Sequence, residues 1–284
     1  MKNLKNIIFV LTLVIIASSC KKNVVEYEST AISGLAEFQL HYFVPIAAGD
    51  TNNIYQVQIN DQLYANNTSP LLTYNAIPNG SVGKFFTTKV GENNIKLYKG
   101  TTLNLTYNQN VTLTKGKQNV FVYDFNKPPI VFDNGFPYQS PTTDSTSKTG
   151  WVKFYNFLYE AVDVPTTMKL QYQWQYTMDI NSGQKSDWIN LGKAVSFGEA
   201  TGWEPITIIK TDLISSGSAR IDYRIRMIDA TGNDTGSLVV LNASNKLVDY
   251  SDYWNASIGR RYHHVLSGIR TQKPTSAVRV FTAL

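Results

Sequence analysis

The sequence predicts an all-β protein, and three observations support this fold class. Residues favoured in strands are abundant, with 17 Tyr and 13 Phe among 284 residues, together with many Thr, Val and Ile. Several segments alternate apolar and polar residues with a period of two, the pattern of a strand with one buried face. No long segment shows the 3.6-residue or heptad period of a helix. We therefore expect short strands joined by turns.

The chain begins with a segment typical of export signals, which ends at the only cysteine. Lys2 and Lys5 precede an apolar run over residues 7–17, and small residues lead up to Cys20. The run has about half of the roughly 20 apolar residues that a membrane-spanning helix needs, so it favours a cleaved signal. The pattern resembles a bacterial lipoprotein signal, which implies that residues 1–19 are removed and that Cys20 is acylated. The alternative is a conventional signal peptide in which Cys20 is a dispensable thiol.

Residues 20–33 are expected to be a tether between the lipid and the first strand, because they mix charge with a few apolar side chains. A lipid on Cys20 implies a membrane partner and a place in the cell envelope, which we expect to be the outer membrane. Bacteroidota-type lipoproteins on the cell surface often carry an acidic run after the cysteine, whereas Lys21 and Lys22 follow it here. The periplasmic and the surface face therefore both stay open.

Cysteine content and charge restrict how the protein is stabilised and what it binds. If Cys20 is acylated, no thiol remains for a disulfide, so burial of a hydrophobic core must stabilise the fold. Two of the 26 basic residues, Lys2 and Lys5, leave with the signal, and the rest only slightly outnumber the 21 acidic residues. This balance is not typical of nucleic-acid-binding proteins, and we expect no nucleic-acid partner.

Residues 34–128 are predicted to form a first β-sandwich domain. Short apolar segments alternate with turns rich in Gly, Pro, Asn and Asp. This spacing is typical of an immunoglobulin-like or transthyretin-like sandwich. Strands are expected at Leu35–Val44, Ile54–Ile59, Gln62–Ala65, Leu71–Ala76, Val82–Val90, Ile95–Lys99, Leu103–Tyr107, Val111–Thr114 and Asn119–Phe125.

Residues 129–148 are predicted to be an extended linker. Prolines are concentrated around this stretch, and they lack the backbone N–H groups that strand pairing needs. The Ser/Thr run that follows them cannot form a hydrophobic core. Within it, Asp144-Ser145-Thr146 resembles the three-residue acceptor for O-glycosylation in Bacteroidota-type envelopes, which makes Ser145 a candidate for modification. The alternative is an unmodified flexible linker.

Residues 149–284 are predicted to form a second, tandem β-sandwich domain. Residues 168–178 and 219–229 alternate strictly, and the polar face of the later segment carries Arg220, Asp222, Arg224 and Arg226. Only Thr211–Ser216 could turn helically. Strands are expected at Trp151–Ala161, Met168–Met178, Trp188–Val195, Glu204–Lys210, Ala219–Asp229, Ser237–Asn242, Tyr262–Ile269 and Ala277–Leu284.

A weak internal repeat relates the two predicted domains. Residues 116–124 can be laid on 259–267, and Phe38–Val44 lies similarly on Val152–Leu158. The whole mature chain resembles uncharacterised Bacteroidota-type cell-envelope lipoproteins with tandem Ig-like β-sandwich domains. The resemblance implies an architecture and brings no catalytic motif.

No pattern of catalytic residues stands out. Residues 194–198 are one residue off the nucleophile-elbow pattern, but that elbow needs a strand-to-helix turn, so Ser196 is interpreted as a strand serine. Glu199 and Glu204 flank Trp203 and could serve a glycosidase, although no predicted fold requires it. We expect no enzyme and no cofactor.

Metal ligands are equally sparse. The histidines are His41, His263 and His264, and the adjacent pair must point to opposite faces of a strand. Residues 229–234 concentrate oxygen ligands and could hold calcium, yet their composition is also that of a plain hairpin turn, which we favour. We expect no metal.

A ligand site is predicted on the second domain, where all five tryptophans lie. Aromatic faces can stack on sugars or side chains, while Arg and Asp give directional hydrogen bonds. The alternative, which we favour, is that Trp151 and Trp174 are core and that residues 250–254 plug one end of the sandwich. The candidate residues are Tyr250, Tyr253, Trp254, Arg260, Arg261 and Tyr262.

Two functions remain for such a chain. The first is a non-catalytic, membrane-anchored binding lipoprotein whose partner is a glycan, a peptide or an envelope protein. The second is a structural subunit of a fimbria, which resembles Bacteroidota-type pilins processed by an Arg-specific protease in the N-terminal domain. Because Arg220 is the first arginine, that processing has no site in the first domain. We therefore expect the binding function.

Overall fold

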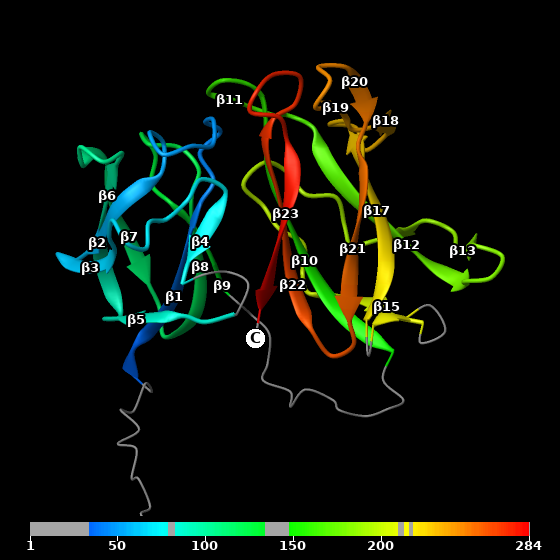
Figure 1. Ribbon diagram of the computed structural model, residues 1–284, viewed down its shortest axis with the longest axis horizontal. Coiled ribbons are helices and arrows are strands. Elements are labelled where there is room, and N and C mark those ends of the chain that lie inside the picture. The colour runs from blue at the N-terminus through cyan, green and yellow to red at the C-terminus, as the bar shows by residue number, and fades with distance from the viewer. Residues whose placement is uncertain (1–33, 79–82, 134–147, 210–212, 216–217, 284) are drawn as a thin grey trace, which may run out of the picture. The chain divides into compact units, whose positions relative to one another are not determined.

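The computed structural model in Figure 1 describes residues 34–78, 83–133, 148–209, 213–215 and 218–283. Every element in these ranges is a β-strand, and the strands form five sheets. The predicted all-β fold class is therefore confirmed. None of the described residues belongs to a helix long and apolar enough to cross a membrane. Cys20, the tether up to residue 33 and Ser145 lie outside the described residues.

Two sheets enclose a core in the first half of the chain. Sheet I has the order β3 (Gln62–Ala65), β2 (Ile54–Ile59), β6 (Gly91–Lys99) and β7 (Asn104–Leu113). Sheet II has the order β4 (Asn75–Ile77), β1 (Ala36–Tyr42), β8 (Gly116–Val122) and β9 (Ile130–Asp133), and β5 (Phe86–Thr88) also pairs with β1. Alternate residues of both sheets bury their side chains in one hydrophobic cluster, which includes Leu40, Val57, Leu97 and Val120. This is sandwich packing.

Two further sheets enclose a second core. Sheet III has the order β11 (Val164–Pro165), β10 (Thr149–Ala161), β22 (Arg261–Ile269) and β23 (Ala277–Ala283), with β15 (Glu204–Thr207) beside β10. Sheet IV has the order β13 (Gln184–Lys185), β12 (Lys169–Asp179), β17 (Ser218–Ile228) and β16 (Leu213–Ser215). In sheet IV, β14 (Ile189–Asn190) also pairs with β12, and both β18 (Asp234–Ser237) and β21 (Ser251–Ser257) pair with β17. β19 (Val239–Leu241) and β20 (Leu247–Asp249) form a separate ribbon.

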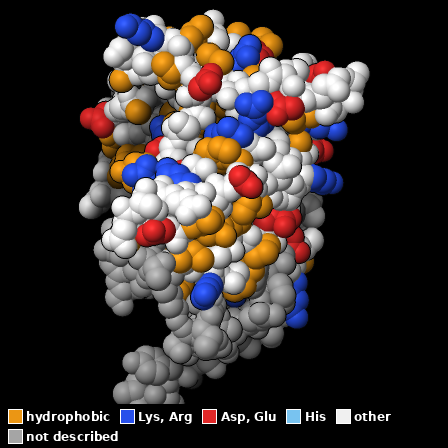
Figure 2. Space-filling view, turned by 90° about the vertical axis from the view of Figure 1, so that its right-hand side faces the viewer, with side chains coloured by type: hydrophobic (Ala, Val, Ile, Leu, Met, Phe, Trp, Pro, Cys, Tyr) orange, Lys and Arg blue, Asp and Glu red, His pale blue; other side chains and the backbone are white. Residues whose placement is uncertain are grey.

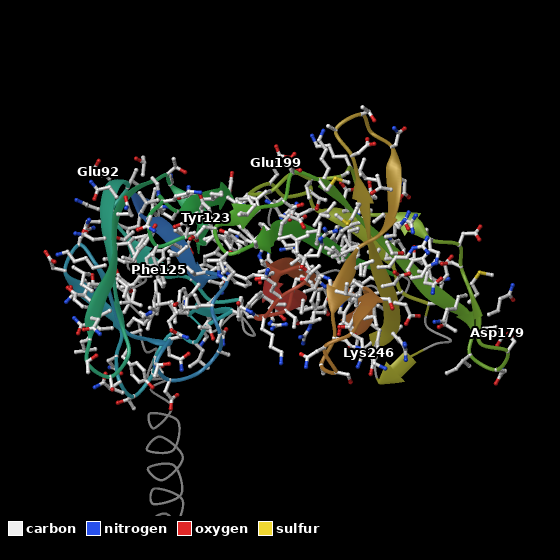
Figure 3. All side chains as sticks on the ribbon, turned by 90° about the horizontal axis from the view of Figure 1, so that it is seen from above. Glu92, Tyr123, Phe125, Asp179, Glu199 and Lys246 are labelled. Carbon is white, nitrogen blue, oxygen red and sulfur yellow. The ribbon has the colours of Figure 1, made fainter. Side chains whose placement is uncertain are left out.

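A third cluster joins the outer faces of sheets II and III, and we call it the central layer: Phe43, Ala76, Phe121, Tyr155, Phe157, Val265 and Phe281. The ring centroid of Phe121 lies 5.1 Å from those of both Tyr155 and Phe157. The hydroxyl of Tyr159 donates a hydrogen bond of 3.0 Å to the backbone carbonyl of Tyr123, which is labelled in Figure 3. Residues 33–284 accordingly form one compact unit.

The internal repeat corresponds to equivalent strand pairs. β1 runs parallel to β8, and β10 runs parallel to β22, so each half pairs an early strand with a late one. The segments matched in the sequence overlap these four strands, but the match lays Phe121, which faces the central layer, on His264, which faces the second core. The immunoglobulin-like or transthyretin-like classification of each half stays a prediction.

Several boundaries in the first half differ from the prediction. Where strands were expected at Leu71–Ala76 and Val82–Val90, the described residues form only the shorter β4 and β5. Residues 91–94 were expected as a turn but belong to β6, and residues 108–110 were expected to separate two strands but lie within β7. Both segments are rich in asparagine, and the side-chain amide of Asn94 donates to Asn108 and Asn110 across the exposed face of the sheet. Residues 130–133, placed in the linker, form β9, because Pro128 and Pro129 precede the strand and remove no ladder donor.

Several corrections concern the second half. Of the strand expected at Trp188–Val195 only β14 forms, and the one expected at Ser237–Asn242 is divided between β18 and β19. The stretch expected to turn helically contains β16, which pairs with β17. Residues 250–254 were expected to plug one end of the sandwich, but residues 251–257 form β21 along the other edge of β17. Their short apolar alternation is easily missed beside the stronger pattern of Tyr262–Ile269.

The three histidines are buried in the described core, and their environments keep them neutral. Burial lowers the pKa of His41 to about 3, although its hydrogen bond with Asn119 opposes the shift. Burial also lowers the pKa of His264 to about 3. The pKa of His263 is held well below its usual value by burial first and by the nearby His41 second.

These histidines make the protein sensitive to mild acid. Each titrates near pH 6.5 when unfolded but only far lower when folded, so below about pH 6.5 the unfolded state binds more protons and stability falls as pH falls. Each histidine should contribute about 1.4 kcal/mol per pH unit to this loss. Urea unfolding at pH 7.5, 6.0 and 5.0 measures the slope. His41→Asn should reduce this slope by the equivalent of about one proton taken up on unfolding. A variant slope equal to that of the wild type would show that His41 is already protonated in the folded protein.

Candidate functional site

The outer face of sheet IV carries polar side chains in register across three strands. Gln175 on β12 lies opposite Asp222 on β17, and Asp222 lies opposite Tyr253 on β21. Because side chains alternate along a strand, the apolar neighbours of these residues fill the core while these residues point outward. Figure 2 faces this side of the molecule and shows acidic, basic and hydrophobic side chains interspersed on it.

A hollow of about 400 Å³ lies over this row, and we call it the sheet IV hollow. Its size falls within the usual range for small-ligand sites. It is lined by Gln175, Lys185, Trp188, Arg220, Asp222, Tyr223, Ser251, Asp252 and Tyr253.

Asp222 is the electrostatic centre of the hollow. Its side chain accepts two hydrogen bonds from Arg220, at 2.9 Å from Nε and 2.8 Å from Nη2, and one from Lys185 Nζ at 2.5 Å. Asp222 is only 8% exposed, and a buried carboxylate persists when partners of opposite charge surround it. The three bonds hold Arg220 and Lys185 in place, so the walls of the hollow are preorganised.

Two aromatic rings form walls of the hollow, and an arginine guanidinium group packs against the face of each. The guanidinium carbon of Arg220 lies 3.8 Å from the centroid of Tyr253, and that of Arg224 lies 4.3 Å from the centroid of Trp188. Nε of Arg224 also donates to Oε1 of Gln173 at 2.8 Å, which restrains the arginine. Cation–π contact fixes the orientation of both rings. The hollow therefore combines oriented aromatic surfaces with fixed donors.

Asp252 supplies an exposed acceptor at the rim. The hydroxyl of Tyr223 donates to its carboxylate at 3.4 Å and lies 3.3 Å from the hydroxyl of Tyr250. Burial raises the pKa of Tyr223 far above its usual value, so this hydroxyl stays protonated and able to donate. The hollow thus offers charge-balanced donors and acceptors rather than a surplus of one charge.

The structure separates the six residues singled out in the sequence. Tyr253 is 51% exposed and lines the hollow, and Arg260 is exposed elsewhere. Tyr250, Trp254, Arg261 and Tyr262 are each at most 8% exposed, so they offer no broad surface to a ligand. Trp254 is buried beside the exposed Tyr253 because residues 251–257 form a strand, whose neighbouring side chains point to opposite sides. Trp254 contacts His264 in the core, at 4.4 Å between ring centroids.

Sequence reasoning missed most of the hollow. Lys185 and Trp188 lie in the stretch that pairs with β12, whereas Asp252 lies on β21, so only the pairing of β12 with β17 and of β17 with β21 brings them together. Part of the signal was available, because the alternating Arg220, Asp222 and Arg224 were predicted to line one outer face.

The other candidates have structural roles. His263 Nδ1 lies 2.8 Å from the hydroxyl of Tyr155 in the central layer, whereas His264 Nδ1 lies 3.0 Å from that of Tyr172 in the second core. The adjacent histidines thus face opposite sides, as predicted. Among the described residues, no group of His, Cys, Asp or Glu side chains could hold a metal ion.

Residues 229–234, which were interpreted as a plain hairpin turn rather than a calcium site, form a self-contained turn. Oδ1 of Asp229 accepts hydrogen bonds from the backbone N–H and the hydroxyl of Thr231 and from the backbone N–H of Asn233. Asp234 forms an ion pair with Arg226 at 2.9 Å. Both carboxylates are therefore occupied by turn contacts.

Ser196 lies in a turn rather than in the strand expected for it. Its backbone N–H donates to Oε2 of Glu199 at 2.9 Å, and Glu199 points outward at an edge of the molecule in Figure 3. This contact gives Glu199 a role in shaping the turn.

No protein-family profile and no curated protein matches the sequence. Among solved structures, the chain is similar to the Bacillus anthracis TIE protein, with 7% sequence identity, a TM-score of 0.23 and coverage of 84% of this chain and 34% of that one. The chain thus spans about a third of that protein's length. It is also similar to a DUF3823 family protein from Bacteroides ovatus, with 11% identity, a TM-score of 0.20 and coverage of 78% and 99%. At these TM-scores the likenesses say nothing about function.

Proposed function

We propose that this protein is a non-catalytic lipoprotein of the cell envelope, anchored in the outer membrane through Cys20, that binds a glycan in the sheet IV hollow. The observation that carries the proposal is the hollow itself, in which Trp188 and Tyr253 stand beside the fixed Arg220–Asp222–Lys185 network. The export signal ending at Cys20 supports the anchoring.

The chemistry of the hollow suits a sugar. A pyranose ring presents apolar C–H faces that pack on aromatic rings, and its hydroxyl groups both donate and accept hydrogen bonds. The carboxylate of Asp252 can accept hydrogen bonds from such hydroxyls, the amide of Gln175 can both donate and accept, and the guanidinium of Arg220 offers directional donors. Because Asp222 and Asp252 together balance the charges of Arg220 and Lys185, the hollow favours a neutral polar ligand over a strongly charged one.

Replacing Cys20 should release the protein from membranes. Each buried CH₂ of an acyl chain contributes about 0.8 kcal/mol, so the several chains of a mature lipoprotein hold it firmly. Cys20→Ser should therefore move the protein to the soluble periplasmic fraction, whereas Ser18→Ala should leave it with membranes. A Cys20→Ser protein that stays membrane-bound would contradict lipid anchoring.

Glycan binding should depend on Tyr253 and Trp188. A screen of glycans against the whole mature chain identifies the ligand, and Tyr253→Ala or Trp188→Ala should weaken its binding by about tenfold or more, as loss of a central aromatic contact does. Leu247→Ala, which removes a 58% exposed side chain of the same half outside the hollow, is the matched control.

The neighbours Tyr253 and Trp254 should behave oppositely. Tyr253→Ala should lower stability by about 1 kcal/mol at most, since the ring is half exposed, whereas Trp254→Ala should cost about 3 kcal/mol or more. Thermal unfolding of both variants checks this. A wild-type chain that binds no glycan, or a Tyr253→Ala chain that binds as well as wild type, would refute the assignment of the hollow.

A further inference from the structure

A second hollow, of about 330 Å³, lies on the outer face of sheet I, and we call it the sheet I hollow. Gln56 and Gln58 of β2 lie in it, Leu63 of β3 stands beside them, and Leu103 comes from the turn before β7. It belongs to the other half of the chain and shares no residue with the sheet IV hollow.

The lining of the sheet I hollow has a different chemistry. Among the described residues that line it, none carries a charge: they are Tyr55, Gln56, Gln58, Leu63, Asn66, Asn67, Thr68 and Leu103. Side-chain amides both donate and accept hydrogen bonds. Leu63 is 51% exposed and Leu103 is 37% exposed, so two apolar side chains stand in water beside these amides.

The polar groups are held in place by their neighbours. The hydroxyl of Tyr98 donates to Oε1 of Gln58 at 3.2 Å, which orients the amide nitrogen of that glutamine. Oδ1 of Asn66 accepts from the backbone N–H groups of Thr68 and Ser69, at 2.9 and 3.1 Å, and so shapes the adjoining turn. The hollow is thus formed without a ligand.

Leu103 is the unusual residue of this site. Its φ is +55°, in the left-handed region that Gly and Asn adopt more readily than a bulky side chain. Its backbone N–H donates to the carbonyl of Gly100 at 3.1 Å, which holds the turn. A glycine or asparagine would relieve the backbone strain, yet the chain places an exposed leucine there. Strained residues of this kind often serve a binding site.

We propose that the sheet I hollow binds a neutral N-acetylated sugar. An acetamido group consists of a methyl group bonded to an amide, and this hollow places apolar side chains beside side-chain amides, so the two are complementary. Leu63 and Leu103 can enclose the methyl group, Gln56 and Gln58 can exchange hydrogen bonds with the amide, and Tyr55 can pack on the ring. The lining offers no positively charged partner to a carboxylate or phosphate.

Calorimetric titration of the mature chain with the trimer of N-acetylglucosamine tests the proposal, with the glucose trimer of the same linkage as the comparison ligand. The acetylated trimer should bind about tenfold more tightly or better, because the leucine and glutamine side chains contact only its acetamido groups. Leu103→Asn and Gln58→Ala should abolish this preference. Leu105→Asn, which replaces a 51% exposed leucine on the same face outside the hollow, should retain it.

Leu103→Asn also separates binding from folding. Asparagine tolerates the left-handed backbone, so the melting temperature of this variant should stay at or above that of the wild type while binding is lost. Equal binding of the two trimers by the wild type, or a preference that survives in Leu103→Asn and Gln58→Ala, would overturn the proposal. Loss of the preference through Tyr253→Ala in the sheet IV hollow would overturn it too, since binding would then lie in the other half.

Discussion

The central layer between sheets II and III is the constraint on which the rest of this structure depends. Phe121 of β8 packs into it, while Val120 and Val122 of the same strand fill the first core. On the other side, Val265 of β22 packs into it, and Leu266 fills the second core. Strands buried on both faces lose the alternation of polar and apolar residues, and every residue of β22 is indeed buried. Burial on both faces also explains why three histidines lie in the core in neutral form.

The same layer decides where a ligand can be bound. The central layer covers one face of sheet II and one face of sheet III, and the hydrophobic cores cover their opposite faces. Among the described sheets of the two sandwiches, only sheets I and IV therefore keep a broad face in solvent. Both hollows lie on these faces. They differ in how they are organised, since a buried carboxylate at Asp222 fixes one and uncharged amides line the other. One chain thus offers two chemically distinct surfaces.

Much of the fold could be predicted from the sequence because local patterns determine it. β2 and β3 have the predicted bounds, and the strictly alternating segments became β12 and β17. The prediction failed where a local pattern misleads: asparagines that suggest turns lie in β6 and β7, and residues 251–257 are too few to show a clear period. The candidate site was harder. Tyr253 was predicted, but Lys185 and Trp188 join it only through pairing between strands far apart in sequence, which no local pattern reveals.

Native-state hydrogen exchange tests the central layer most directly. If β8 and β22 share a buried layer, opening either strand exposes the other, so their slowest backbone amides should exchange with the same free energy, that of global unfolding. Measurement on the mature chain across a series of low denaturant concentrations gives this value for each strand. The structure predicts that the two strands coincide. Amides of β8 that exchange at a clearly lower free energy than those of β22 would show that the halves open independently, and would contradict a shared layer.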